Sequence, residues 1–283
     1  MGSSAVEQFV DGARGRPTPR LRPYVGCYSG YWLDGFGPGT HQGLPSGSLT
    51  MVLSLGPTVD IAVMPDPTHA PASYDALVGG LHAAPVTIAY ERSQRGVQID
   101  LTPFGARALF GLPAGELGST VVALDALLGR RADEWLDRLR GARSWAARFA
   151  VLDDVLARAL LDGPEPAPEV VQAWDKLVSC SGGIEVAALA REVGWSRRHL
   201  TQRFQEELGL SPKVTARVLR FDRARRLLGR PARPALADVA AVCGYFDQAH
   251  LNREFRELSG LTPTAWLAEQ LPSVQDDLDL LSA

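Results

Sequence analysis

The sequence predicts an α+β protein of more than one domain, with an N-terminal β-barrel plus helices followed by an all-α domain. Three observations predict this class. Short apolar runs between glycine and proline breaks fill the first hundred residues, as in a barrel or sandwich of short strands. Amphipathic helical spacings follow them. The last third holds two similar segments of helical pattern, which predict two helix-turn-helix units joined by a long helix.

The predicted strands lie between residue 20 and about residue 102. They are Val25–Trp32, Leu49–Leu55, Asp60–Met64, Ala84–Tyr90 and Gly96–Leu101. Several of these runs are apolar on consecutive residues, so the pattern does not decide which face of each strand points inward. Residues 1–19 are rich in Gly, Arg and Pro without periodicity, and we expect them to form a flexible lead-in.

From about residue 104 the same domain is predicted to be helical. The expected helices cover residues 104–110, 119–128, 132–139 and 144–161. In the last two, apolar residues recur at spacings of three and four, which is typical of amphipathic helices. Their apolar faces belong either to the core of this chain or to the interface with a second copy in a dimer.

A proline-rich segment marks the predicted domain boundary. Three prolines fall within five residues of the stretch 162–169, and prolines hold a backbone semi-extended and outside a helix. The sequence therefore predicts a first domain over residues 20–161 and a second over 170–272, which opens with a helix at Val170–Ser179. Residues 273–283 form an acidic tail.

Composition excludes several classes of protein. No run of about 18 apolar residues occurs, so no membrane span is predicted. The first residues carry no basic patch followed by an apolar core, so we expect no secretion signal. Cys27, Cys180 and Cys243 have no C-x-x-C spacing, which fits a reducing cytoplasm and no structural metal site.

Charge is distributed unevenly along the chain. Residues 172–268 contain 15 Lys and Arg against 10 Asp and Glu, a net charge of +5, although the whole chain carries −3. A basic module beside an acidic domain is expected when only one end of a protein meets phosphate. This balance is modest by itself and gains weight because it coincides with the repeat.

The two similar segments match position by position. At an offset of 51 residues, Leu200, Phe204, Gly209 and Ser211-Pro212 correspond to Leu251, Phe255, Gly260 and Thr262-Pro263. Upstream, Ala190 and Gly194 correspond to Ala240 and Gly244 at an offset of 50, so the second copy has one extra residue in its turn. Each copy predicts a helix, a tight turn and a helix. Two such units in tandem indicate a reader of two successive major-groove faces of DNA.

In the first copy, a helix over Ile184–Glu192 leads to Gly194, where the turn needs a positive φ that glycine readily adopts. Ser196 is placed to cap the next helix, Arg197–Glu206, in which Leu200 and Phe204 point inward. The outward residues, called here the first reading head, are Arg197, Arg198, Thr201 and Gln202. Arg suits guanine and Gln suits adenine.

The second copy follows the same logic. Asp247 takes the capping role after the longer turn, and Leu251 and Phe255 point inward. The outward residues, called the second reading head, are Gln248, Ala249, Asn252 and Arg253. Asn and Gln suit adenine, and Ala249 suits a thymine methyl group. The long helix between the copies, over residues 212–228, would hold the heads about one DNA turn apart.

The helix pairs, the arginines and the two histidines also have interpretations that do not involve DNA. A helix-turn-helix outline also describes an ordinary helical hairpin, and exposed arginines commonly form solvated or ion-paired surface. The long helix carries five arginines, at positions 217, 220, 223, 225 and 226. His199 and His250 occupy equivalent positions beside the core leucines, and we interpret them as packing or phosphate-contact residues rather than as ligands or bases.

Residues 175–268 resemble the AraC/XylS family of bacterial transcription regulators. The strongest part is Asp238–Pro263, in which alanines, Gly-aromatic, Asp, His, Arg-x-Phe, Gly and Thr-Pro follow at the family's spacing. The resemblance implies a seven-helix domain with two helix-turn-helix units that bind asymmetric sites near promoters. It also places Arg198, Thr201 and Gln202, and the whole second reading head, where family members read bases. In some members the second head mostly contacts the DNA backbone.

The segments Leu44–Gly56 and Leu101–Ala114 are similar to sensor domains found on such regulators. The resemblance implies a cupin-like barrel followed by helices that dimerise, and in many members a bound small effector. His41, His69 and His82 are widely spaced, without the cluster that would hold a metal, so a metal-free barrel is expected. The candidates to line a pocket are Tyr28, Tyr31, Trp32 and His41, although aromatic residues in barrels are commonly core.

Together these patterns predict a cytoplasmic, homodimeric transcription regulator, an activator or a repressor, that binds double-stranded promoter DNA. Contact with RNA polymerase and control by a small effector are further expectations, and no cofactor is predicted. An enzyme is not expected, because the sequence contains no metal cluster, no G-x-S-x-G elbow and no phosphate loop. A regulator without an effector, whose barrel only dimerises, remains an alternative.

Overall fold

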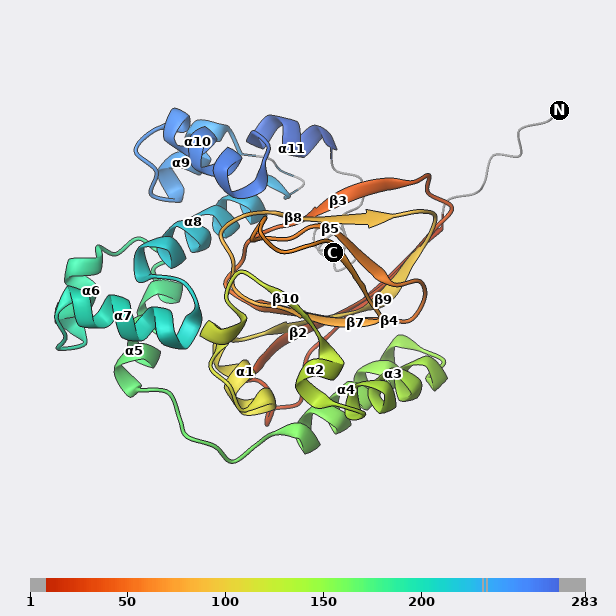
Figure 1. Cartoon of the computed structure of the whole chain (residues 1–283). Helices are drawn as coiled ribbons and strands as arrows, with labels where there is room; N and C mark the ends of the chain where they lie inside the picture. The colour runs from red at the N-terminus through yellow and green to blue at the C-terminus, as the bar shows by residue number, and fades with distance from the viewer. Residues whose placement is uncertain (1–8, 231, 233, 270–283) are drawn as a thin grey trace.

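The computed structural model describes residues 9–230, 232 and 234–269. Two antiparallel sheets lie face to face, and a group of helices lies at one end of them (Figure 1). The larger sheet has the strand order β1 (Phe9–Gly15), β2 (Val25–Asp34), β9 (Gln94–Leu101), β4 (Leu49–Ser54), β7 (Ala76–Gly79) and β10 (Val121–Ala123). The smaller has the order β3 (Gly39–Gly43), β8 (Val86–Tyr90), β5 (Val59–Val63) and β6 (Ala72–Tyr74).

The prediction of a closed barrel is corrected by this topology, because the described strands pair within two open sheets. The physical reason lies in the runs that are apolar on consecutive residues. Along β4, every residue except Thr50 is buried, which is the pattern of a strand covered on both faces. One face of the larger sheet meets helices and the other meets the smaller sheet, so the fold is layered.

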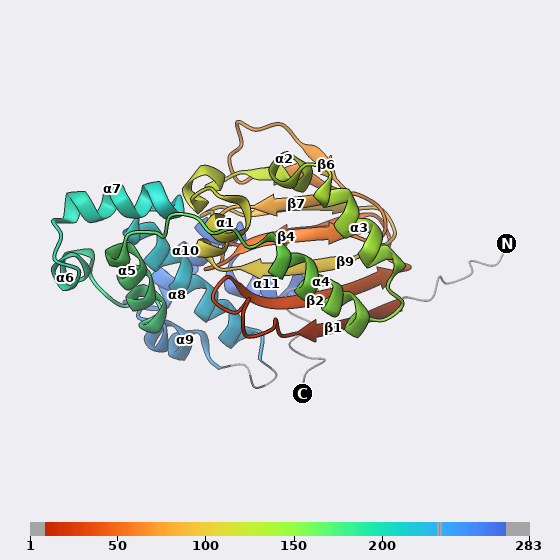
Figure 2. The same ribbon diagram turned by 90° about the horizontal axis from the view of Figure 1, so that it is seen from below.

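Helices cover the outer face of the larger sheet (Figure 2). They are α1 (Pro103–Phe110), the 3-10 turn η1 (Ala114–Leu117), α2 (Leu124–Leu128), α3 (Arg131–Gly141) and α4 (Trp145–Ala159). A Cβ atom on Gly30 of β2 would lie 2.3 Å from the Trp145 ring, so the glycine lets α4 lie directly on the sheet. Leu152 and Leu156 are fully buried there. The apolar face of α4 therefore belongs to the core of this chain, which was one of the two interpretations of its sequence pattern.

Two expected elements differ in the structure. Residues 9–15, expected within the flexible lead-in, form the edge strand β1, which pairs with β2 from Phe9↔Asp34 to Gly15↔Tyr28. Backbone hydrogen bonds hold an edge strand without any apolar alternation, so the pattern gave no signal. The predicted helix over 119–128 begins only at Leu124, because residues 121–123 pair with β7 as β10.

The C-terminal part is helical. Its seven described helices, the number that the family resemblance implied, are α5 (Pro168–Ser179), α6 (Val186–Glu192), α7 (Arg197–Leu208), α8 (Pro212–Leu228), α9 (Leu236–Val242), α10 (Gln248–Ser259) and α11 (Pro263–Glu269). Helix α5 begins inside the predicted linker 162–169, and the predicted acidic tail lies outside the described residues. No helix in the described part of the chain combines the length and the apolar character that crossing a bilayer requires.

The two parts of the chain touch where η1 meets the end of α7. A Cβ atom on Gly115 would lie 2.1 Å from the carbonyl oxygen of Glu206, so only a glycine permits this approach. Beside it, Arg107 donates two hydrogen bonds to the Glu207 carboxylate, at 2.9 and 2.6 Å. The Arg107 and Glu207 side chains are only 20% and 13% exposed. The proline-rich segment therefore joins two parts that are packed together.

Gly115→Ala should loosen this contact without changing the Arg107–Glu207 pair. The added methyl group would overlap backbone, at an overpacking cost of at least about 1 kcal/mol. We expect proteolytic cleavage within residues 162–167 to become roughly fivefold faster or more. Gly141→Ala is the matched control, because nothing lies within 4 Å of a Cβ at that position. Equal cleavage rates for the two variants would contradict the close packing of η1 on α7.

Candidate nucleic-acid interface

Two helix pairs, α6 with α7 and α9 with α10, have the same turn. Gly194 and Gly244 have φ of 73° and 75°, a left-handed conformation that favours glycine. In each turn the residue after the glycine donates its N–H to a carbonyl five residues earlier, Trp195 to Ala190 and Tyr245 to Ala240, at 2.9 Å in both. This pattern satisfies the free carbonyls at a helix end, and it confirms the predicted role of both glycines.

Both predicted N-caps are also confirmed. The Ser196 hydroxyl accepts a hydrogen bond from the His199 N–H at 3.2 Å, and the Asp247 carboxylate accepts one from the His250 N–H at 2.7 Å. These caps satisfy backbone donors at the first turn of α7 and α10. Each pair therefore begins its second helix at a fixed residue.

The inward faces of α7 and α10 are apolar, as predicted. Leu200, Phe204, Leu251 and Phe255 are all 0% exposed. The rings of Phe255 and of Phe221 on α8 lie 4.9 Å apart, edge to face. Because these positions are committed to the core, the opposite face of each helix remains toward solvent.

The structure places the first reading head on that outward face. Arg197, Arg198 and Gln202 are exposed, and Thr201 is half-buried. The Gln202 amide donates to the Glu206 carboxylate at 2.9 Å, so this amide would exchange partners on reaching a base. The His199 ring, also exposed, lies 4.5 Å from the Trp195 ring.

The second reading head is similar in placement. Gln248, Ala249 and Arg253 are exposed, whereas Asn252 is half-buried and its amide oxygen is enclosed without a hydrogen-bond partner. His250 packs its ring edge to face on Tyr245, with centroids 5.3 Å apart. That both heads contact bases stays a prediction.

The arginines of α8 have a structural role that the sequence pattern missed. Arg217 donates to Glu254 at 2.9 Å and also to Glu257, and Arg220 donates to Glu254 at 3.4 Å. Glu254 belongs to α10 and is only 7% exposed. These hydrogen bonds outweigh burial and raise the pKa of Arg217. The arginines therefore fix α10 on α8. In the sequence, the only indication of this role was Glu254, a charged residue at an inward position of α10.

A second buried carboxylate lies further along α8. Asp222 is 2% exposed and pairs with Arg225 at 3.0 Å and with Arg226. Together with Arg217 and Arg220, four of the five arginines on this helix are committed to carboxylates of the same domain. Most of the positive charge of the long helix is thus paired within the domain.

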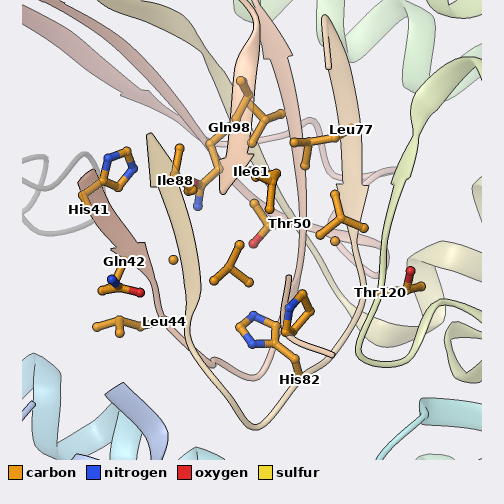
Figure 3. A pocket seen from close by; sticks show the side chains of 17 residues that line it. His41, Gln42, Leu44, Thr50, Ile61, Leu77, His82, Ile88, Gln98 and Thr120 are labelled. Atoms are coloured by element: carbon orange, nitrogen blue, oxygen red, sulfur yellow. The ribbon is translucent and has the colours of Figure 1, made fainter. Parts of the chain in front are cut away.

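A cavity lies between the two sheets (Figure 3). Its volume is about 90 Å³, which is room for several waters or a small ligand. Polar side chains from several strands and loops face it among apolar ones, namely His41, Gln42, Thr50, His82, Gln98 and Thr120. A neighbouring cavity of about 320 Å³ shares His41, Ile88 and Gln98 with it.

Of the four predicted pocket residues, two line a cavity between the sheets and two do not. His41 lines both cavities and Tyr31 lines the larger one. Tyr28 is fully buried under α4, where its hydroxyl donates to Asp153 at 2.9 Å. Trp32 lies beneath Arg95, whose guanidinium is 4.4 Å from the ring centroid, and lines neither cavity. Successive side chains of a strand point to opposite faces of a sheet, so Tyr28 and Trp32 lie on one face of β2 and Tyr31 lies on the other.

Sequence reasoning missed most of the polar lining. Gln98 could have indicated the cavity, because it is a polar residue within the predicted strand that is β9. Gln42 is a polar residue within β3, a strand that was not predicted. Within the described ranges, no group of three or more His, Cys, Asp or Glu side chains is placed to hold a metal ion. The lining offers neutral hydrogen-bonding groups, because burial lowers the pKa of His41 to about 4 and also lowers the pKa of His82.

Glu254→Ala should destabilise the protein by about 1–3 kcal/mol, because two partly buried guanidinium groups would lose their carboxylate. The measurement is the free energy of unfolding of the full chain in urea. Glu192→Ala is the control, because Glu192 pairs with Lys176 on the surface and both side chains are 43% exposed. That pair should contribute less than about 1 kcal/mol. Equal losses for the two variants would contradict a bracing role for Glu254.

His41 should make the stability of the fold depend on pH. Its folded pKa of about 4 lies below its ordinary value of 6.5, so the unfolded chain binds more protons between these two values. The free energy of unfolding should therefore fall as pH decreases from about 6.5 to about 4. His41→Gln should reduce that decrease, whereas His69→Gln, at an exposed position, should not. The same pH dependence in both variants would remove His41 as its source.

The two parts of the chain match different protein families. Residues 189–269 match the family described as "Helix-turn-helix domain". Residues 13–123 match the family described as "Domain of unknown function (DUF6597)". The first match begins within α6 and covers the rest of both helix pairs, and the second begins within β1 and covers the rest of the two sheets.

Individual relatives are regulators. The chain is 28% identical over 193 residues to the probable thc operon regulatory protein of Rhodococcus erythropolis, covering 56% of this chain and 57% of that protein. It is 38% identical over 80 residues to the HTH-type transcriptional regulator GbdR of Pseudomonas aeruginosa, covering 28% and 22%. The matches thus span about half or less of these relatives' lengths.

Among solved structures, an AraC-type DNA-binding domain protein from Chromobacterium violaceum is 26% identical, with 38% of this chain and 96% of that chain covered and a TM-score of 0.34. The helix-turn-helix family match and the repeated capped turns concern the same segment. Residues 189–269 of this chain therefore form a helix-turn-helix domain, and the proteins to which the chain is similar are bacterial transcriptional regulators.

Proposed function

We propose that the whole chain is a transcription regulator that binds double-stranded promoter DNA through two helix-turn-helix units, α6–α7 and α9–α10. The observation that carries the proposal is the repetition of turn, cap and outward face in the two pairs. Gly194 and Gly244 share one conformation, and Ser196 and Asp247 share one capping role. The N-terminal residues of α7 and α10 would enter successive major grooves.

The bracing of α8 supports binding by two units at once. Helix α8 contacts α7 and α10, and the pairs Arg217–Glu254 and Arg220–Glu254 fix its contact with α10. A rigid connection keeps the distance between the two heads constant, so the second unit would bind with little further loss of orientational freedom. Exposed arginines of the heads, Arg197, Arg198 and Arg253, would supply contacts to phosphate or guanine and a strong salt dependence.

We further propose that a small neutral effector binds in the cavity between the sheets. Thr120 lines the cavity, and its N–H donates to the carbonyl of Leu117 in η1 at 3.2 Å. Gly115 of η1 packs on the end of α7. An effector that favours one position of the 119–121 segment would thereby favour one position of the first reading head.

The proposal includes a homodimer that contacts RNA polymerase in the cytoplasm and no enzymatic step. The apolar faces of α3 and α4 are covered within the chain, with Trp135, Leu136, Leu152 and Leu156 all buried. The dimer contact would therefore use other surfaces of the N-terminal part.

Replacing Arg198 or Gln202 by Ala should weaken binding of the full chain to its preferred DNA sequence by roughly 5- to 150-fold, the effect of losing one paired base contact of about 1–3 kcal/mol. That sequence is first obtained by selection from random-sequence duplexes. Binding is then measured at several salt concentrations. Two boxes about one helical turn apart are expected in the selected motif.

Arg158→Ala is the charge-matched control for Arg198→Ala. Arg158 lies on α4, is 77% exposed and pairs with Asp154, so its loss should leave DNA affinity unchanged. If no sequence is enriched by the wild-type chain even at low salt, the proposed function is wrong. If a motif is enriched but both Ala variants bind it as tightly as the wild type does, the assignment of the first reading head is wrong.

A further inference from the structure

The extra residue in the second turn is Phe246. In the first turn the N-cap Ser196 follows Gly194 by two positions, whereas in the second turn the N-cap Asp247 follows Gly244 by three. Trp195 and Tyr245 occupy matching places, since both donate to the carbonyl five residues earlier. Phe246 therefore has no counterpart in the first helix pair.

The side chain of Phe246 is 93% exposed, and the other large hydrophobic residues exposed in the described part of the chain reach at most 53%. Burying such a side chain is favourable, and this protein does not gain that contribution when it folds alone. A large exposed aromatic side chain at a fixed place is typical of a contact made with another molecule.

The backbone at Phe246 is held firmly. Its N–H donates to the His250 ring at 3.3 Å, and the next residue, Asp247, caps α10. The preceding residue, Tyr245, is 5% exposed and packs on the His250 ring. Phe246 thus projects from a well-defined position directly before the first turn of α10.

The surroundings of Phe246 point to DNA rather than to an apolar protein surface. The exposed residues in the first two turns of α10 are Gln248, Ala249 and Arg253, a mixture of a hydrogen-bonding, a small apolar and a cationic side chain. This mixture fits a groove that presents hydrogen-bonding edges, phosphates and one kind of apolar group. In the major groove, that apolar group is the C5-methyl of thymine.

We propose that Phe246 is a specificity-determining residue of the second reading head, which packs on a thymine methyl group when α10 lies in the major groove. The inference rests on the proposed function, since it requires that α10 enters DNA. It separates the two heads chemically: the first presents Arg197, Arg198 and Gln202, and has no exposed aromatic residue before its N-cap. Only the box read by α10 would then depend on a thymine methyl.

The test uses the full chain and the duplex selected from random sequences. Each thymine is replaced in turn by deoxyuridine, which removes the C5-methyl and leaves base pairing intact. For the wild type, one substitution in the α10 box should weaken binding about fourfold, the effect of one buried methyl group. Phe246→Ser should weaken binding to the thymine duplex about tenfold or more, and it should lose the sensitivity to that deoxyuridine.

Phe246→Leu should keep the sensitivity, because it retains an apolar side chain. Val178→Ser is the matched control, since Val178 is exposed on α5, outside both heads. Equal thermal stability of all four proteins is expected from the exposure of the substituted side chains.

Three results would overturn the inference. Undiminished binding by Phe246→Ser would show that Phe246 does not touch DNA. Weaker binding with the same deoxyuridine sensitivity as the wild type would show contact with sugar or phosphate instead. Absence of any motif enriched by the wild-type chain would overturn the proposed function first, and the inference with it.

Discussion

The placement of the second helix pair depends on the ion pairs that join α8 to α10. Helix α8 contacts α5, α7, α9, α10 and α11, and the buried Glu254 of α10 restricts movement between α8 and α10. Glu254 receives Arg217 and Arg220, and Asp222 receives Arg225 and Arg226. A partly buried ion pair is unfavourable to break, because it leaves a charge away from water. The arginines of α8 thus contribute mainly to ion pairs within the protein and less to attraction between the protein and DNA.

The same helix brings the DNA-binding part against the sheets. A Cβ atom on Gly47, in the loop between β3 and β4, would lie 2.9 Å from Leu219 of α8. On the other side, η1 meets the end of α7 through Gly115 and the Arg107–Glu207 pair. A change in the space between the sheets therefore has a short physical path to the first reading head. The second head has no such contact with η1 and depends on α8.

The helix pairs were predictable because their determinants are local in sequence. A turn glycine, a capping Ser or Asp and two inward apolar residues at a spacing of four lie within about a dozen positions. The apolar runs located β2, β4, β5, β8 and β9 but not β3, β6 and β7. They did not decide the arrangement of the strands, since a run apolar on both faces fits a barrel wall or a covered sheet. The edge strand β1 was missed, because backbone pairing with β2 requires no side-chain pattern.

The candidate sites divide in the same way. The outward faces of α7 and α10 follow from helical periodicity, so the sequence by itself assigned the residues of these faces and the extra residue in the second turn. Which arginines of α8 are engaged was decided only by the tertiary structure, because Arg217 and Glu254 are 37 residues apart. Arg107 and Glu207 are 100 residues apart. Local periodicity carries no information about such pairs, and the cavity between the sheets arises in the same way, from strands that meet only in the folded chain.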